Sequence, residues 1–129
     1  MAQINSYKDL LVWQKAVELV TTVYTITRKF PPEEKFGLSS QIQRAAVSIA
    51  ANIAEGHGRG TRNDYAHFLD IAHGSVSETE TLLTIARTLS FCDAQQHSTI
   101  EERLSEIGKM LGSLRSKLRA TSSSLKPNT

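Results

Sequence analysis

The chain has 129 residues, of which 40% are hydrophobic and 22% charged, the size and composition of a single folded domain. Its 15 Lys and Arg against 13 Asp and Glu give a formal charge of only +2, so total charge alone does not call for a nucleic-acid partner. A single cysteine excludes an internal disulfide. With neither a signal peptide nor an apolar run of the ~20 residues that span a bilayer, we expect a cytoplasmic, bacterial-type protein without a membrane segment.

Two helices are predicted in the first half of the chain, over about residues 9–29 and 38–56. In the first, apolar side chains recur at three- and four-residue spacing, which is typical of one buried helical face. They are Trp13, Ala16, Val20 and Val23, with Val12, Leu19 and Ile26 beside them. A Phe-Pro-Pro run at positions 30–32 ends this helix, because each proline removes a backbone donor and fixes φ. Residues 33–37 connect the two helices, and three glycines within positions 56–60 end the second.

The third and fourth helices are predicted over about residues 61–90 and 94–121. Each begins at a capping pattern, in which Thr or Asp precedes an acidic or amide residue by three positions. The two pairs are Thr61 with Asp64 and Asp93 with Gln96. The fourth helix carries the cleanest heptad of the chain, formed by Ile100, Leu104, Ile107, Leu111, Leu114 and Leu118. Residues 122–129 have no periodicity, which predicts a flexible tail.

No segment alternates polar and apolar residues for long enough to make a convincing strand. Four helices with short connections pack most simply as an antiparallel up-down bundle. The sequence therefore predicts an all-α, four-helix-bundle domain over residues 1–121.

The second helix is more apolar than a one-subunit bundle requires. Its polar residues fall in one narrow stripe of the helical wheel, namely Gln41, Arg44, Ser48, Asn52 and Glu55. Most of the remaining circumference is apolar, whereas facing a bundle core needs a stripe only somewhat over ~100° wide. We therefore expect the small side chains of this helix to form an interface with a second subunit. The residues of this expected interface are Ala46, Val47, Ala50, Ala51 and Ala54. The alternative is that alanine serves here only as a good surface helix former.

Four polar residues of the second and third helices are predicted to be structural: Arg44, Asn52, Glu55 and Glu78. Glu78 lies one heptad from both Ile71 and Ile85, so its carboxylate is expected in a partly buried seam. A buried carboxylate needs a partner, and Arg44 or Arg59 could supply one. We interpret Glu78 as part of a structural ion pair rather than as a catalytic group.

The sequence predicts no catalytic residue, metal or cofactor. Asp64 with His67 and Asp70 with His73 have the i, i+3 spacing of bundle metal ligands, but all four lie on one helix and no other helix carries a second pair. The glycines at positions 56–60 follow a helix and lack a subsequent Lys-Ser or Lys-Thr, so a phosphate-binding loop of a nucleotide enzyme is excluded.

Basic residues are concentrated after Glu106, where no acid follows. These cations could simply complement the dipole at the helix C-terminus. If several subunits place the C-terminal ends of their fourth helices side by side, these cations could instead form a patch that binds RNA or DNA. Two further arginines flank the start of the third helix, where an anion such as phosphate is favoured. The five residues predicted to contact nucleic acid are Arg59, Arg62, Arg115, Lys117 and Arg119.

Ordered matches from about Leu11 to Leu118 make the chain resemble the 23S rRNA intervening-sequence proteins, also called an S23 ribosomal-protein-like family. They include Val12-Trp13-Gln14-Lys15-Ala16, Phe30-Pro31, Phe36-Gly37-Leu38, Gln41-Ile42-Gln43-Arg44-Ala45-Ala46-Val47-Ser48-Ile49, Asn52-Ile53-Ala54-Glu55-Gly56, Gly58-Arg59, Phe68-Leu69-Asp70-Ile71-Ala72-His73-Gly74-Ser75 and Glu78-Thr79-Glu80-Thr81. The family usually has proline and serine at the positions of Ala50 and Ala51, so this chain departs from the pattern where a kink would be expected.

The resemblance implies a homopentameric barrel of four-helix subunits. The chain is also similar to the accessory protein of diversity-generating retroelements, a basic pentamer that associates with a reverse transcriptase and its RNA. We therefore expect a non-enzymatic, oligomeric protein that binds itself and either structured RNA or an RNA-associated protein. One alternative is a protein-binding scaffold without nucleic-acid affinity. Another, less favoured, is an enzyme that uses Glu55, His57 or Glu78 in an unrecognised pocket.

Overall fold

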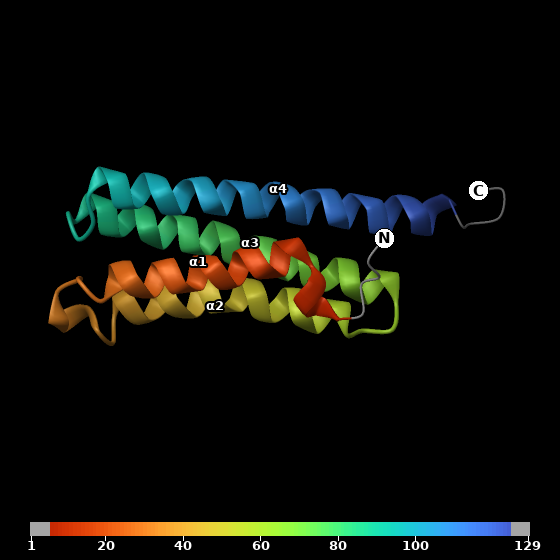
Figure 1. Ribbon diagram of the computed structural model, residues 1–129, viewed down its shortest axis with the longest axis horizontal. Coiled ribbons are helices and arrows are strands. Elements are labelled where there is room, and N and C mark those ends of the chain that lie inside the picture. Colours follow the sequence, from red (N-terminus) through yellow and green to blue (C-terminus); the bar gives the residue numbers. More distant parts are fainter. Residues whose placement is uncertain (1–5, 125–129) are drawn as a thin grey trace.

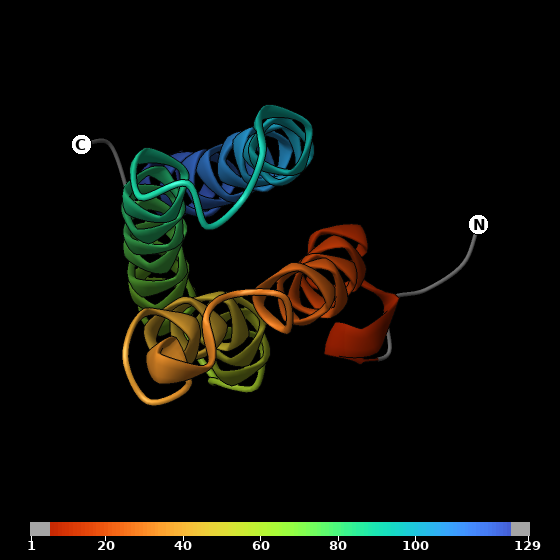
Figure 2. The ribbon, with the colours of Figure 1, turned by 90° about the vertical axis from the view of Figure 1, so that its left-hand side faces the viewer.

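The computed structural model describes residues 6–124, which form four long helices and two single-turn 3-10 helices. The long helices are α1 (Leu11–Thr27), α2 (Leu38–His57), α3 (Arg62–Thr88) and α4 (Ala94–Ser124), and the short ones are η1 (Tyr7–Asp9) and η2 (Pro32–Glu34). Successive helices run in opposite directions (Figure 1) and lie in chain order around the bundle (Figure 2). The predicted all-α four-helix bundle is confirmed, and no strand occurs within the described range.

Two ends of the bundle are distinguished by the connections they hold. The α1–α2 end holds the loop of residues 28–37 and the turn of residues 89–93. The α2–α3 end holds the turn of residues 58–61 and the C-terminal part of α4, which projects beyond the other helices (Figure 1). Segments far apart in the sequence therefore meet at each end.

Side-chain caps begin α3 and α4, as the sequence predicts. Thr61 Oγ1 accepts a hydrogen bond from the Asp64 amide at 3.1 Å. Asp93 Oδ1 accepts from the Gln96 amide at 2.8 Å, while Gln96 Oε1 accepts from the Asp93 amide at 2.9 Å. These bonds satisfy amides that a helix N-terminus otherwise leaves unpaired.

Several helix boundaries differ from the predicted ones by a few residues. The α1 helix ends at residue 27, followed by a short turn in which the Phe30 amide donates to the Thr27 carbonyl oxygen. The α3 helix ends at Thr88 because Ser90 has φ of 63°, a left-handed conformation that stops a right-handed helix. The α4 helix continues to Ser124, so residues 122–124 of the predicted tail are helical; residues 125–129 lie outside the described residues.

The core is formed by one face of each helix. Four members of the α4 heptad are fully buried: Ile100, Leu104, Ile107 and Leu111. On α1 the buried apolar positions are Val12, Ala16, Leu19, Val23 and Ile26, which leaves Trp13 and Val20 only half-buried. The one buried threonine of α3, Thr79, donates its hydroxyl to the Ser75 carbonyl oxygen at 2.7 Å and so has no unmet polar group. Within residues 6–124, none of the helices combines the length and apolar character needed to cross a bilayer.

Candidate nucleic-acid interface

The antiparallel course of the helices brings all five cations predicted to bind nucleic acid to the α2–α3 end. Arg59 lies in the turn after α2, and Arg62 is the first residue of α3. The other three lie on the last part of α4: Arg115, Lys117 and Arg119. All five side chains are at least partly exposed. The positions come from two separate stretches of sequence, residues 59–62 and 115–119, and only the bundle places them together.

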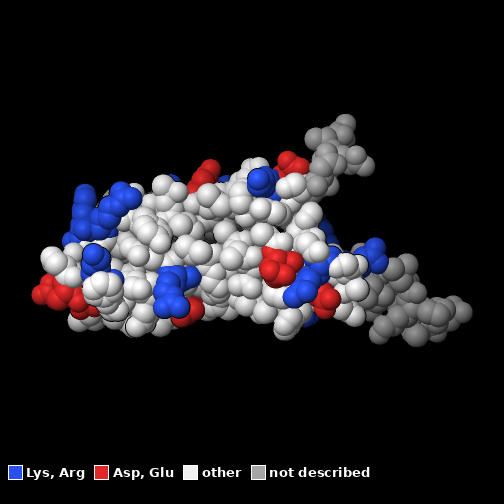
Figure 3. Space-filling model, turned by 90° about the horizontal axis from the view of Figure 1, so that it is seen from below, with Lys and Arg blue, Asp and Glu red and all other residues white. Residues whose placement is uncertain are grey.

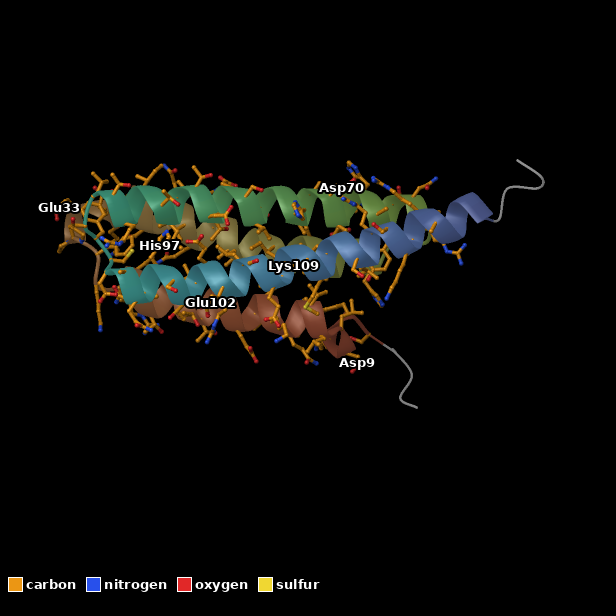
Figure 4. The ribbon with its side chains drawn as sticks, turned by 90° about the horizontal axis from the view of Figure 1, so that it is seen from above. Asp9, Glu33, Asp70, His97, Glu102 and Lys109 are labelled. Carbon is orange, nitrogen blue, oxygen red and sulfur yellow. The ribbon has the colours of Figure 1, made fainter. Side chains whose placement is uncertain are left out.

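Asp70 on α3 holds two of these arginines. Arg115 Nη1 donates a hydrogen bond to Asp70 Oδ1 at 2.7 Å, and Arg119 Nη2 donates to Asp70 Oδ2 at 2.6 Å. Because the two arginines are four residues apart, they share one face of α4, and each takes one carboxylate oxygen. Figure 4 shows Asp70 on α3, toward the end at which α4 projects. Two positive charges thus face one negative charge, and the cluster stays cationic.

The ionisation of Asp70 reflects these neighbours. Partial burial acts to raise the pKa of its carboxyl, but the hydrogen bonds and positive charges of Arg115 and Arg119 together outweigh burial. The pKa of Asp70 therefore lies below its usual value. The carboxylate is ionised at neutral pH and keeps both guanidinium groups in fixed positions.

Arg59 is also held in place, by contacts with two side chains. Its Nε lies 3.4 Å from Glu55 Oε2, one helical turn earlier, and its guanidinium carbon lies 4.9 Å from the centre of the Phe68 ring. Stacking on a ring leaves the edges of a guanidinium open to other acceptors. Arg62 is exposed, and no hydrogen bond or ion pair of its side chain is found among the described residues.

The arrangement can bind anions at fixed points. A guanidinium has five N–H donors, and the contacts with Asp70 and Glu55 use only some of them. The remaining donors of Arg59, Arg115 and Arg119 can bind phosphate oxygens, and guanidinium geometry suits such oxygens.

A second surface feature is an apolar groove between α1 and α2, with a volume of about 320 Å³. It is lined by Tyr7, Trp13, Val17, Val20, Val47, Ala50, Ala51 and Ala54. The face that α1 and α2 share is largely uncharged along its middle, while basic and acidic side chains both gather at the α1–α2 end (Figure 3). Four of the five predicted interface residues line this groove, together with α1 residues that the sequence did not assign to an interface.

Comparison with known proteins places the chain in a family. The sequence profile of the 23S rRNA-intervening sequence proteins matches residues 8–113, most of the chain. The chain belongs to this family. This intervening-sequence protein is also similar to a solved structure, the crystal structure at 1.70 Å resolution of a protein with unknown function from the S23 ribosomal protein family of Bacteroides thetaiotaomicron VPI-5482. The two are 29% identical, the match covers 81% of this chain and 98% of the other, and the TM-score is 0.74. No curated protein matches the chain.

One predicted interface residue of this intervening-sequence protein is wrongly assigned. Ala46 is 0% exposed and belongs to the subunit's own core, so it has no surface to offer a second subunit. Val47, at 42% exposed, and Ala51 point outward instead. The helical wheel gives the relative angle of these side chains, but the position of α1 beside α2 decides which of them are covered.

The predicted buried ion pair of Glu78 is also wrong. Glu78 is exposed, and no ion pair joins it to Arg44 or Arg59 among the described residues. Glu78 and Arg44 do line the same shallow surface pocket between α2 and α3, whereas Arg59 pairs with Glu55 at the end of α2. The heptad neighbours Ile71 and Ile85 are themselves partly exposed, at 39% and 42%. The stripe that suggested burial therefore lies on the outer edge of α3.

The polar residue Asn52 does have a structural position in this family member. Its Nδ2 donates to the Ser48 carbonyl oxygen at 2.8 Å and to Ser48 Oγ at 2.9 Å. Ser48 Oγ in turn lies 2.9 Å from Ser75 Oγ of α3. This short chain of hydrogen bonds links α2 to α3 where the two helices pack.

The residues considered from the sequence as possible catalytic or metal-binding groups are not brought together in the structure. Glu78 lies beside Arg44, near the middle of the bundle, while Glu55 and His57 lie at the C-terminal end of α2. His57 packs edge-on against Tyr65, with 5.7 Å between ring centres. Among the described residues, no three His, Cys, Asp or Glu side chains are grouped as a metal site would require. Asp70, a member of one metal-spaced pair, contacts arginines instead.

Cys92 is buried where α3 turns into α4. Burial raises the pKa of its thiol, with a smaller contribution in the same direction from Asp93, and Arg87 acts against them. The thiol is therefore the favoured form at neutral pH, which is typical of a structural cysteine.

Proposed function

We propose that this intervening-sequence family member is an oligomeric binding protein that holds structured RNA against its α2–α3 end. One observation supports this most directly, namely that Arg115 and Arg119 share the single carboxylate of Asp70. The pair is held in position and stays cationic, which is what phosphate recognition by a rigid surface needs. Lys117, Arg59 and Arg62 add positive charge from neighbouring elements at the same end.

Binding is favoured over catalysis by the chemistry of these groups. Guanidinium groups stay protonated near neutral pH and so cannot serve as general acids or bases. Asp70 has a lowered pKa and is occupied by two arginines, so it is a poor general acid or base. The cluster is suited to hold an anion rather than to transform one.

Self-association is the second part of the proposal. The α1–α2 groove leaves Val17 and Val47 partly exposed next to alanines, and small side chains allow close approach of another helix. A ring of subunits would bring several copies of the α2–α3 end together, which raises the weak charge of one subunit to that of an extended basic surface. The pentamer implied by the sequence resemblance is the size we expect.

The groove also favours a second candidate function, a protein-binding scaffold. In such a scaffold the basic residues only complement the dipole at the C-terminal end of α4. The two functions differ in their salt dependence. RNA binding through phosphates weakens steeply with salt, whereas docking into an apolar groove changes little.

The experiment is fluorescence anisotropy with a labelled RNA hairpin and a matched DNA duplex, each at low and near-physiological salt. We expect tight RNA binding at low salt, which the variant Arg115→Ala/Lys117→Ala/Arg119→Ala loses. The slope of log K against log salt should fall in magnitude by roughly one for each phosphate contact removed. Arg103→Ala is the control, because it removes a cation of α4 that bonds Thr22 far from the α2–α3 end. Absence of RNA binding at low salt would leave the scaffold as the better account.

A further inference from the structure

The most exposed large apolar side chain of the described residues is Phe36, in the loop between α1 and α2. Phe36 is 89% exposed, whereas the next, Leu11, is 56% exposed. Single surface apolar residues are common, but a phenylalanine held almost entirely in water forgoes the burial of a large apolar area. Contact with a ligand would recover that stabilisation.

The loop around Phe36 is an ordered platform. The Glu34 amide donates to the Pro31 carbonyl oxygen at 2.9 Å, and the Gly37 amide donates to the Glu34 carbonyl oxygen at 3.0 Å. Glu34 Oε1 accepts from the Leu38 amide at 3.0 Å and so caps the start of α2. These bonds hold the residues on both sides of Phe36, so the backbone that carries the ring needs little further ordering on binding.

One cation lies beside this ring, and a second lines the neighbouring pocket. Lys35 Nζ lies 5.5 Å from the centre of the Phe36 ring. Lys35 and Arg28 also line a pocket of about 350 Å³ next to the loop. The same pocket has apolar walls from Phe30 and two prolines, and polar groups from Thr27, Ser39 and Gln43. Gln43 Nε2 donates to Thr27 Oγ1 at 2.9 Å, which fixes the polar wall.

We propose that this aromatic-basic loop, defined as Arg28, Lys35, Phe36 and the adjoining pocket, binds unpaired nucleotides of a single-stranded RNA segment. One base stacks on the Phe36 ring, and a neighbouring nucleotide occupies the pocket. Its phosphates lie toward Arg28 and Lys35. An exposed aromatic ring beside cations is the combination by which single strands are held without sequence readout. This inference rests on the proposed RNA-binding function and adds a second contact, at the end of the bundle opposite Asp70.

A protein partner is less favoured by the surroundings of the ring. The centres of protein interfaces are depleted of charged residues, whereas Phe36 lies among Lys35, Glu33 and Glu34. Glu33 lies at the extreme α1–α2 end of the bundle (Figure 4). These acids keep the local net charge low, so affinity for RNA depends mainly on stacking, and moderate affinity is expected.

The test measures binding of a labelled, unstructured ten-nucleotide RNA and of the hairpin used above. Phe36→Ala should weaken binding of the single strand about tenfold, within the range found for loss of one base-stacking contact. Phe36→Trp should restore it, because tryptophan offers a larger stacking surface. Leu89→Ala is the matched control, since Leu89 is an exposed apolar residue, at 53%, of the α3–α4 turn at the same end.

Charge and stacking can be separated in the same assay. Arg28→Gln/Lys35→Gln should reduce the salt dependence of single-strand binding, while Phe36→Ala should lower affinity at every salt concentration and leave the slope unchanged. Circular dichroism and light scattering should show an unchanged fold and mass for each variant.

Three outcomes would overturn the inference. Unchanged single-strand binding by Phe36→Ala, with hairpin binding still lost in the α4 triple variant, removes this site and leaves the proposed function in place. A change of oligomer mass in Phe36→Ala assigns the ring to a contact between subunits instead. Failure of the wild-type protein to bind either RNA removes both the site and the proposed function.

Discussion

Phe68 of α3 lies directly against Gly56 of α2. A β-carbon built on Gly56 would be 2.8 Å from the Phe68 β-carbon, closer than real β-carbons approach, and 3.2 Å from the Tyr65 carbonyl oxygen, which is also a tight contact. Glycine therefore allows the two helices to meet closely next to the turn that carries Arg59, whose guanidinium stacks on the same Phe68 ring. Gly56, which the sequence pattern indicates only as one of the glycines that end the second helix, therefore also sets the packing of the predicted RNA-binding end.

Gly56→Ala should destabilise the protein by about 1–2 kcal/mol, because overpacking outweighs the backbone entropy that alanine saves. The control is Gly74→Ala on α3, where a β-carbon would meet nothing within 4 Å. That change should stabilise by roughly 0.5–1 kcal/mol, since alanine is the better helix former. Urea unfolding at one fixed protein concentration measures the change in the free energy of unfolding for both variants. Equal effects of the two substitutions would contradict the close contact.

Asp70→Asn should lower the free energy of unfolding at pH 7 by about 1 kcal/mol or less, because Asp70 and its partners are partly exposed and water screens the pair. The sign follows from the lowered pKa of the folded carboxyl. The stabilisation is fully present above the unfolded pKa, about 4, and is lost as pH falls through the folded pKa.

The measurement for this pair is the difference between wild type and Asp70→Asn in urea unfolding from pH 7 down to pH 3. The difference should shrink at the acid end and at high salt. Glu102→Gln, at an exposed position of α4 (Figure 4), is the control and should leave the free energy of unfolding at pH 7 nearly unchanged. A difference independent of pH would mean that the Asp70 charge does not stabilise the folded state.

Ala51→Glu should dissociate the proposed oligomer, because a carboxylate in the α1–α2 groove would be buried without a partner. Multi-angle light scattering should give a mass near 14.3 kDa for the variant and a multiple of it, five by the family resemblance, for the wild type. Gln41→Glu adds the same charge to an exposed position of α2 on the side of Arg44 and should leave the mass unchanged. A wild-type protein that remains a single chain at micromolar concentration would exclude self-association at this face.

Glu78→Leu should change the free energy of unfolding by less than about 0.5 kcal/mol, as expected of an exposed side chain without an ion pair. Thermal unfolding followed by circular dichroism is sufficient to measure it. A loss of several kcal/mol in the free energy of unfolding would instead support the buried ion pair that the heptad position of Glu78 suggested.

The sequence by itself determined the four helices and the core face of α4. The α4 heptad, the prolines after α1 and the glycines after α2 act locally, through side-chain period and backbone restriction, so they can be recognised without knowledge of the neighbours. The caps at Thr61 and Asp93 are local for the same reason. The family pattern is likewise a property of residue order, and the profile match confirmed it.

Only the tertiary structure decided which side chains meet. Asp70 had the same spacing to His73 as a bundle metal ligand, yet its partners are Arg115 and Arg119, more than 40 positions later in the sequence. Ala46 and Val47 are neighbours in an apolar run, but packing of the bundle buries the first and leaves the second exposed. Exposure and pairing depend on the angle at which one helix faces the next, a relation between distant segments that residue order along a single helix does not contain.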